Sequence, residues 1–259
     1  MSVLIGASGW QYRSWRGVFY PERLAQRLWL EHYATAFQTV EVNNTFYRLP
    51  PASTFAAWAQ RTPDDFRVTV KASRYLTHVR RLREPEDSVR RLMDAAEPLG
   101  TKAGPVLLQL PPDMRAAFDA LERTMRAFPP GVALAVEPRH PSWFEPRLRR
   151  LLEARDAALV LADRGSTPVA PLWRTATWGY LRLHEGRGAK SPCYGPTALR
   201  SWARRLADMY GSDADVWVYF NNDPRGCAVH DARAFARHAT REGMHPTRVP
   251  ERPVRPSAP

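Results

Sequence analysis

Residues 39–50, TVEVNNTFYRLP, are the stretch that decides the fold. The stretch opens as a strand in which two valines, Val40 and Val42, alternate with polar neighbours, and it ends at a pair of prolines. Successive side chains of a strand point to opposite faces. If the valines face a layer of helices, Glu41 and Asn43 face an interior that accepts a carboxylate and an amide.

Similar strand patterns recur along the chain and are separated by helical ones. Strands are predicted over 5–8, 39–46, 66–71, 106–110, 132–137, 158–163, 178–184 and 214–221. Helices are predicted over 24–37, 53–61, 86–99, 114–128, 143–155, 199–210 and 231–241. Strands that alternate with helices pair in parallel, and eight such units in about 240 residues favour an α/β fold of the (β/α)8 TIM-barrel type.

The predicted barrel is a single parallel, eight-stranded domain over residues 1–245, followed by a Pro- and Arg-rich tail over 246–259 that we expect to be disordered. An open, doubly wound sheet is the main alternative. It is disfavoured because no G-x-G-x-x-G motif follows the first predicted strand.

The chain has 259 residues and a formal net charge of +12. This excess favours anionic partners such as phosphates, nucleotides, nucleic acid or acidic sugars, although an arginine-rich solvated surface is an equally good explanation. The sequence has no stretch typical of a membrane helix and no signal-peptide pattern, so we expect a cytoplasmic protein without a membrane partner. The two cysteines, Cys193 and Cys227, are predicted to be unpaired thiols in a reducing compartment.

Polar side chains gather where the predicted strands end. Near the carboxyl ends of strands two to eight, the side chains expected to point inward are Glu41, Asn43, Lys71, Gln109, Glu137, Arg139, Asp163, Arg182, His184 and Asn221. Burying such groups costs several kcal/mol unless they are partnered, and in TIM barrels the active site lies at the carboxyl ends of the strands. The pattern therefore predicts a functional site at this end.

Four of these side chains are the candidate catalytic groups. Glu137 and Asp163 suit a general acid/base pair, because neighbouring carboxylates push their pKa values apart. His184 is a candidate for proton transfer. Lys71, if buried without a partner, suits a base or a Schiff-base amine.

A structural alternative applies to each of them. Glu41 can instead form a buried salt bridge with Arg182, and Lys71 can do the same with Glu41 or Glu137. The carboxylates and His184 could also ligate a divalent metal. However, the sequence has neither H-x-H nor H-E-x-x-H spacing, so no cofactor is predicted.

The loops after the strands are rich in aromatic and cationic residues. They include Trp10, Tyr47, Arg74, Tyr75, His78, His140, Trp143, Arg187 and Lys190. Stacking rings beside cations suit nucleobases, sugars or phosphates, although large side chains can also simply pack the loops.

Seven ordered motifs, GASGWQYRSWRGVFYP, TVEVNNTFYRLPP, VKASRYLTH, VLLQLPP, VEPRHPSW, YLRLH and VYFNND, resemble the DUF72, or YecE-like, family. The resemblance runs from Ile5 to about His238 and implies a (β/α)8 barrel but no particular reaction. It carries the family's motif positions onto Trp10, Glu41, Asn43, Thr45, Phe46, Tyr47, Lys71, Thr77, His78, Gln109, Pro111, Glu137, Arg139, His140, Trp143, Arg182, His184, Asn221, Asn222 and Asp223. Two positions depart from the family pattern: Pro138 stands where an aromatic residue is usual, and Glu185 where a glycine is usual.

Three functions fit these observations. The first is an enzyme, a hydrolase, lyase or isomerase, that binds a small anionic, sugar-like or nucleotide-like molecule at the mouth of the barrel. In this case Lys71, Arg139 and Arg182 would hold the anion, and Asn43, Gln109 and Asn221 would orient it. The second is a barrel that binds nucleic acid or repairs it as a nuclease does. The third is a non-catalytic scaffold that binds a ligand.

Overall fold

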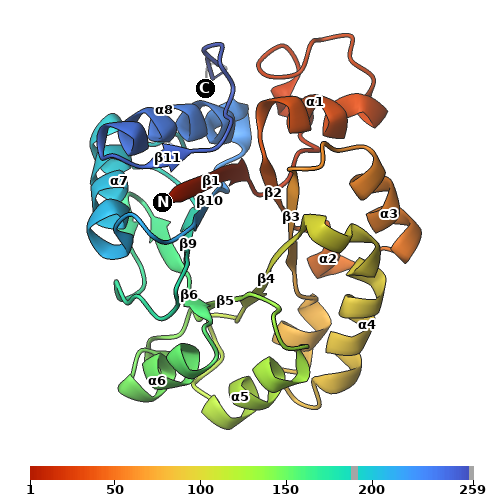
Figure 1. Ribbon diagram of the computed structural model, residues 1–259, viewed down its shortest axis with the longest axis vertical. Coiled ribbons are helices and arrows are strands. Elements are labelled where there is room, and N and C mark those ends of the chain that lie inside the picture. The colour runs from red at the N-terminus through yellow and green to blue at the C-terminus, as the bar shows by residue number, and fades with distance from the viewer. Residues whose placement is uncertain (188–191, 257–259) are drawn as a thin grey trace.

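The computed structural model describes residues 1–187 and 192–256. The strands are β1 (Ser2–Ala7), β2 (Thr39–Val42), β3 (Arg67–Lys71), β4 (Ala103–Gln109), β5 (Leu134–Glu137), β6 (Ala158–Leu159), β7 (Leu161–Arg164), β8 (Thr167–Pro168), β9 (Gly179–Leu183), β10 (Val216–Phe220) and β11 (His245–Pro246). They occupy the middle of the molecule, and the helices lie around them (Figure 1).

The α-helices are α1 (Trp29–Ala36), α2 (Asn44–Tyr47), α3 (Ala52–Gln60), α4 (Glu86–Ala96), α5 (Phe118–Ala127), α6 (Pro146–Ala154), α7 (Pro196–Tyr210) and α8 (Cys227–Arg241). Shorter helical segments cover Arg13–Trp15, Gln26–Leu28, Tyr75–Val79, Glu97–Lys102, Pro141–Trp143 and Pro224–Gly226. Among the described helices, none is long and apolar enough to cross a membrane.

The strands form two sheets, in the orders β11-β1-β10-β9-β7-β8 and β2-β3-β4-β5-β6. Every pairing is parallel except that of β7 with β8. The predicted parallel α/β architecture is therefore confirmed. The backbone ladders, however, do not close into the predicted single eight-stranded barrel.

The first gap between the sheets lies between β1 and β2. Here a tyrosine hydroxyl takes the place of a ladder: Tyr33 Oη accepts from the Ala7 amide at 2.8 Å and donates to the Thr39 carbonyl at 3.0 Å. The two strands approach closely at Gly6, where a Cβ would lie 2.3 Å from the Thr39 oxygen. A larger residue at this position would push the two sheets apart.

The second gap divides the predicted strand 158–163. Its first part, β6, pairs with β5, and its second part, β7, pairs with β9 in the other sheet. Thr175 fills the break, because its hydroxyl accepts from the Leu159 amide and donates to the Ala157 carbonyl, both at 2.8 Å. One continuous segment of chain thus links the two sheets.

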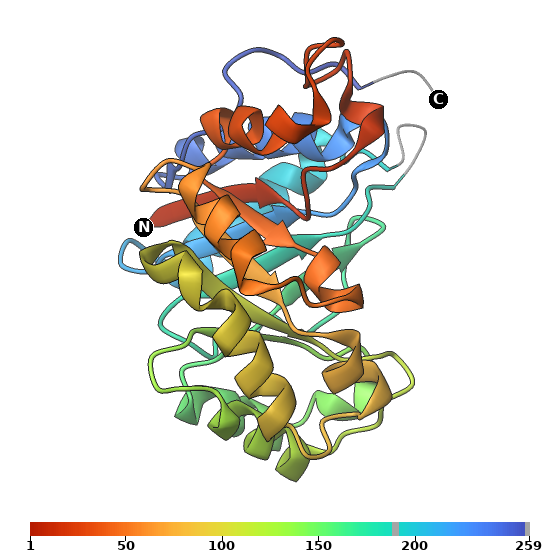
Figure 2. The same ribbon diagram turned by 90° about the vertical axis from the view of Figure 1, so that its right-hand side faces the viewer.

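The strands present different residues to their two sides. Outward residues such as Val40 and Val42 pack in the main apolar core with the helices. Inward residues form a smaller core that includes Leu107, Tyr180 and Tyr219. The parallel strands bring their carboxyl ends to one side of the molecule, opposite the side where the chain begins (Figure 2).

The tail predicted to be disordered makes defined contacts as far as Val254. His245 and Pro246 pair with β1, and Arg248 forms an ion pair with Asp65 at 2.6 Å. Val254 is buried, and its carbonyl contacts His230 Nδ1 at 2.8 Å. The composition of the tail concealed these anchors, and residues 257–259 lie outside the described part.

Candidate active site at the carboxyl ends of the strands

Arg182 of β9 is the centre of the site. Its guanidinium donates to Glu41 Oε1 at 2.7 Å and to Glu137 Oε2 at 2.6 Å. All three side chains are almost completely buried. Because Arg182 belongs to one sheet and both carboxylates to the other, this ion triad joins the sheets through their inward faces. The predicted salt bridge between Glu41 and Arg182 is therefore present.

Glu41 is fully satisfied as an ionised carboxylate. Ser8 Oγ donates to it at 2.7 Å and Tyr180 Oη at 2.5 Å, in addition to Arg182. Burial alone would raise the pKa of Glu41, but the Arg182 charge and the hydroxyl donors hold that pKa below its ordinary value. Glu41 is thus a fixed negative charge and is unsuited to proton transfer near neutral pH.

Glu137 of β5 is held in the same way. It accepts from Gln109 Nε2 at 2.8 Å and lies 3.2 Å from His184 Nε2, and Arg139 approaches its Oε1 at 3.4 Å. Burial opposes ionisation of Glu137, but Arg182 and His184 bring its pKa well below the usual value. Its position favours a role in orienting cations over a role as a general acid.

His184 has a partner at each ring nitrogen. The Asn221 amide lies 3.0 Å from Nδ1, and Glu137 lies 3.2 Å from Nε2. An amide donor at Nδ1 and a carboxylate at Nε2 select the neutral tautomer protonated at Nε2. Burial, followed by repulsion from Arg182, lowers the pKa of His184 despite the opposing effect of Glu137. The ring therefore links Asn221 to the triad and has no nitrogen left for a ligand.

Lys71, at the end of β3, is the ionisable group of the site with the fewest partners. Its ammonium lies 4.3 Å from the centroid of the Phe46 ring, and among the described residues it forms no ion pair or hydrogen bond. The residue is 8% exposed. Burial lowers the pKa of Lys71 to about 8, and repulsion from Arg182 adds to this effect.

His78 lies beside Lys71 in the helical segment Tyr75–Val79. Its ring contacts the Phe46 ring edge-on, with a centroid distance of 4.9 Å, and its Nδ1 lies 2.9 Å from Thr77 Oγ1. Burial and the positive charges of Lys71 and Arg139 lower the pKa of His78 to about 4. Since the side chain is partly exposed, His78 is a neutral imidazole that a ligand can reach.

The start of the chain adds a small cavity to the same end of the strands. It has a volume of about 130 Å³ and is lined by Ser8, Gly9, Trp10, Gln11, Tyr12, Val42, Asn43 and Asn44. Asn43 donates to the Ser8 carbonyl at 3.0 Å, while its Oδ1 is buried with no partner in the described part of the chain. Nearby, burial raises the pKa of Asp223 to about 7.

One candidate catalytic residue, Asp163, lies outside the site. The register pairs Ala162 with Arg182, so Ala162 points inward and Asp163 points to the helices. There its carboxylate accepts from Tyr194 Oη at 2.8 Å and from Trp202 Nε1 at 2.7 Å. The inward parity runs without interruption through Ala158, Val160 and Ala162, so Asp163 follows Leu159 and Leu161 on the outward side, and the predicted Glu137–Asp163 pair does not form.

Several predicted ligand-binding residues have other roles in the structure. Trp143 is fully buried and donates to the Met114 carbonyl at 2.8 Å, and Trp10 packs edge-on against Trp58. His140 caps the segment Pro141–Trp143, where its Nδ1 accepts from the Ser142 amide. These residues shape the loops, whereas Tyr47 is 80% exposed at the rim.

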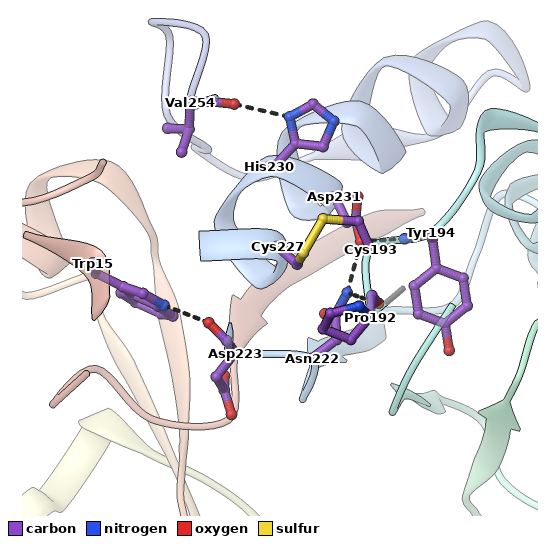
Figure 3. Close-up of a disulfide and its surroundings, with 10 residues drawn as sticks. All are labelled: Trp15, Pro192, Cys193, Tyr194, Asn222, Asp223, Cys227, His230, Asp231 and Val254. Atoms are coloured by element: carbon purple, nitrogen blue, oxygen red, sulfur yellow. Dashed lines mark hydrogen bonds between the residues drawn. A yellow bond between two sulfur atoms is a disulfide. The ribbon is translucent and has the colours of Figure 1, made fainter. Parts of the chain in front are cut away.

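Asn222 supports the loop that follows β9. Its amide donates to Asp231 Oδ2 at 2.7 Å and to the Pro192 carbonyl at 2.9 Å (Figure 3). Beside it, a disulfide joins Cys193 to Cys227 at the start of α8. The prediction of unpaired thiols is therefore wrong. Arg187 is exposed, and Lys190 lies outside the described residues.

Tyr180 is the functional residue that the sequence analysis missed. It shares the inward parity of Arg182 and His184 in the motif YLRLH, so the alternation of side chains along β9 was the signal that could have found it.

In the described part of the chain, no group of three His, Cys, Asp or Glu residues has an arrangement suited to a metal ion. A second cavity, mostly apolar and of about 470 Å³, opens at the amino ends of the strands, where Trp178 and Trp217 line it.

Comparison with known proteins gives a consistent result. The family model described as "Protein of unknown function DUF72" matches residues 4–255. The UPF0759 protein YunF of Bacillus subtilis is 26% identical over 89% of this chain and 92% of its own length. The UPF0759 protein YecE of Escherichia coli is 32% identical over 64% of this chain and 60% of its own length.

Two solved structures are similar along nearly the whole chain. A DUF72 family protein from Thermotoga maritima has a TM-score of 0.80 at 26% identity and covers 92% of this chain and 98% of its own. A DUF72 family protein from Enterococcus faecalis has a TM-score of 0.77 at 18% identity, with 99% of both chains covered, and supports the fold alone. Since the family model spans almost all of the sequence, the chain belongs to the DUF72 family.

Proposed function

We propose that this protein is an enzyme of the TIM-barrel type that acts on a small anionic molecule, sugar-like or nucleotide-like, at the carboxyl ends of its strands. The two sheets, joined by the Arg182 triad and by the Tyr33 hydroxyl, would together form the barrel. The observation that carries the proposal is an excess of positive charge at the opening of the site.

The charges in the site do not balance without a ligand. The two buried carboxylates face three cations, namely Arg182, Lys71 and Arg139. Arg182 already engages both carboxylates at short distances, whereas Arg139 reaches Glu137 only at 3.4 Å and its side chain is 30% exposed. A phosphate or carboxylate between Lys71 and Arg139 would supply the missing negative charge.

The same geometry supports acid/base chemistry by Lys71. Burial lowers the pKa of Lys71 to about 8, so this amine can exchange a proton with a bound molecule near neutral pH, whereas His78, with a pKa of about 4, stays neutral and can accept a hydrogen bond. Glu137 and His184, which were candidates for this role, act in the proposal as positioning residues. Gln109 and Asn221 hold them in place.

Anion binding can be tested by thermal stability. Inorganic phosphate, pyrophosphate and a set of sugar phosphates would be added to the wild type and to Arg139→Ala, with Arg149→Ala as the control, because Arg149 forms only an exposed pair with Glu153. Anions at 100 times Kd should stabilise the wild type by about 2.7 kcal/mol. We expect Arg139→Ala to lose this gain and Arg149→Ala to keep it. Equal stabilisation of both variants would contradict the proposal.

A second candidate function is nucleic-acid binding, which a specific surface feature favours. Tyr47 is 80% exposed and Tyr75 is 56% exposed, and each has an exposed arginine as its sequence neighbour, Arg48 and Arg74. Exposed rings beside cations can stack on bases. Tyr47→Ala combined with Tyr75→Ala should then weaken binding to single-stranded DNA by about 1–3 kcal/mol per lost stacking contact. Binding that does not weaken with salt would argue against this function.

A further inference from the structure

We propose that the Lys71 amine forms an imine with the carbonyl carbon of an anionic aldehyde or ketone. The proposal names the substrate class of the site and rests on the proposed anion-binding function. It is carried by a buried lysine amine that has no ion-pair or hydrogen-bond partner in the described residues, at the opening of a cluster whose carboxylates are already engaged.

The choice of lysine is the first argument. Lysine occurs only three times in the chain, at Lys71, Lys102 and Lys190, although lysine and arginine together number 38. Arginine stays charged under all ordinary conditions, whereas lysine can lose its proton and act as a nucleophile. A site that needed only another fixed positive charge would be served equally well by arginine, which this chain uses nearly everywhere else.

The surroundings of the amine are the second argument. Lys102 shows how this chain binds a lysine that serves as a charge: its Nζ donates to the Ala59 and Thr62 carbonyls, both at 2.6 Å, and lies 3.7 Å from Asp64. Among the described residues Lys71 has no such acceptors, and its ammonium rests on the face of Phe46. Its amine is thus free to approach a bound carbonyl group.

The electrostatic environment favours the neutral amine. Lys71 is faced by the cations Arg182 and Arg139, by the carboxylates Glu41 and Glu137, and by the neutral His78. Both carboxylates are occupied by Arg182, so their attraction for Lys71 is offset. With a pKa of about 8, about a tenth of Lys71 is neutral at pH 7, which is roughly 300-fold more than for an ordinary lysine.

The proposed step is balanced without any redox partner. The neutral amine attacks the carbonyl carbon, the C–N bond forms, and the carbonyl π electrons move to oxygen to give a carbinolamine. That oxygen then leaves as water, taking one proton from the nitrogen and one from solvent, and a protonated imine that keeps the second nitrogen proton remains. His78, whose ring also contacts Phe46, is a neutral imidazole that can accept a hydrogen bond from the carbinolamine. The protonated imine can then withdraw electrons from the neighbouring carbon atom.

The experiment traps this imine on the intact protein. Glycolaldehyde phosphate is the anionic aldehyde probe, and glycolaldehyde is its neutral counterpart. Each is mixed with the protein at pH 7.5, reduced with sodium borohydride and located by peptide mass spectrometry. Labelling of Lys102, Lys190 and the terminal amine in the same sample provides an internal reference. The variants are Lys71→Arg, which keeps the positive charge, and Lys102→Arg as the matched control.

We expect glycolaldehyde phosphate to label Lys71 at least tenfold more than Lys102, and glycolaldehyde to show a smaller preference, because it lacks the anion that Arg139 would hold. Lys71→Arg should abolish this adduct, and Lys102→Arg should leave it unchanged. Labelling of Lys71 no stronger than that of Lys102 would overturn the proposal. Stabilisation by inorganic phosphate, measured on the same wild-type sample, separates the two failures: if it persists without labelling, only the imine is refuted, and if both are absent, the proposed function fails as well.

Discussion

Replacing Arg182 by methionine is the sharpest test of how the site is built. The substitution keeps an unbranched side chain of similar length and removes the positive charge. It leaves Glu41 and Glu137 buried without their shared counter-ion, which each of them contacts at 2.7 Å or less. The loss falls on both sheets, because Arg182 of β9 contacts both carboxylates of the other sheet.

Breaking a buried ion pair by removing one partner typically costs about 3–5 kcal/mol, because the remaining charge is uncompensated. Here two carboxylates lose the partner, but Glu41 keeps its Ser8 and Tyr180 donors and Glu137 keeps its Gln109 donor. We therefore expect Arg182→Met to lower the free energy of unfolding by about 4 kcal/mol at pH 8.

The pH dependence should change sign in this variant. In the wild type the pKa values of Glu41 and Glu137 are lowered, so their contribution to stability is present above the unfolded value of about 4.3 and is lost as the pH falls below it. Without Arg182, burial is the largest remaining effect, and it raises both pKa values. The folded variant then holds protons that the unfolded chain releases, so its stability falls as the pH rises above about 4.3.

Urea denaturation at pH 5 and pH 8, followed by tryptophan fluorescence, measures this effect. The control is Arg149→Met, which removes an exposed pair with Glu153 and should change stability by less than about 0.5 kcal/mol at both pH values. A loss for Arg182→Met below about 1 kcal/mol at pH 8, or an equal loss at pH 5 and pH 8, would refute the reasoning.

Three further predictions concern other parts of the molecule. Cys193→Ser removes the disulfide to Cys227, which lies 34 residues further along the chain. The free energy of unfolding, measured by urea denaturation, should fall by up to about 4 kcal/mol. An unchanged midpoint of urea unfolding would contradict a structural role for the disulfide. His184 should be protonated at Nε2 at pH 7 and less than half charged at pH 6.5, which imidazole nitrogen NMR can measure; a proton on Nδ1 would disprove the arrangement. Burial raises the pKa of Asp223 to about 7, so the ionisation of this carboxyl lowers the free energy of unfolding increasingly as the pH rises from about 4 to 7. Asp223→Asn should therefore gain about 2 kcal/mol over the wild type at pH 8, after allowance for its partial exposure, and nothing at pH 4.

The alternation of strands and helices was readable from the sequence because each strand carries apolar residues on one parity. The division into two sheets was not readable, since it depends on hydroxyl groups that replace backbone partners over long sequence distances. Tyr33 at one gap and Thr175 at the other make bonds that no local pattern reveals. The cysteines illustrate the same limit, because the loop that brings Cys193 to Cys227 is set by tertiary contacts. The predicted cytoplasmic location therefore loses the support of free thiols.

Strand parity also predicted most of the charged cluster. It placed Glu41, Glu137, Arg182 and His184 on one side, where the structure brings them together. It failed for Asp163, because the inward side of this segment carries the small apolar residues Ala158, Val160 and Ala162, and the carboxylate lies on the outward side with Leu159 and Leu161. Parity identifies the inward side where one side of a strand is polar, but a strand that is apolar on both sides does not reveal which side faces inward.

The triad also decides which substitutions can report on function. Glu137 is both part of the site and part of the connection between the sheets, so Glu137→Gln would lower stability and activity together, and its effect could not be assigned to chemistry. Lys71 and Arg139 differ, because the first makes no ion pair among the described residues and the second makes only a long one. Their removal should leave the connection between the sheets intact. A loss of binding or labelling in variants of these two residues, at unchanged stability, would therefore be a loss of function rather than of fold.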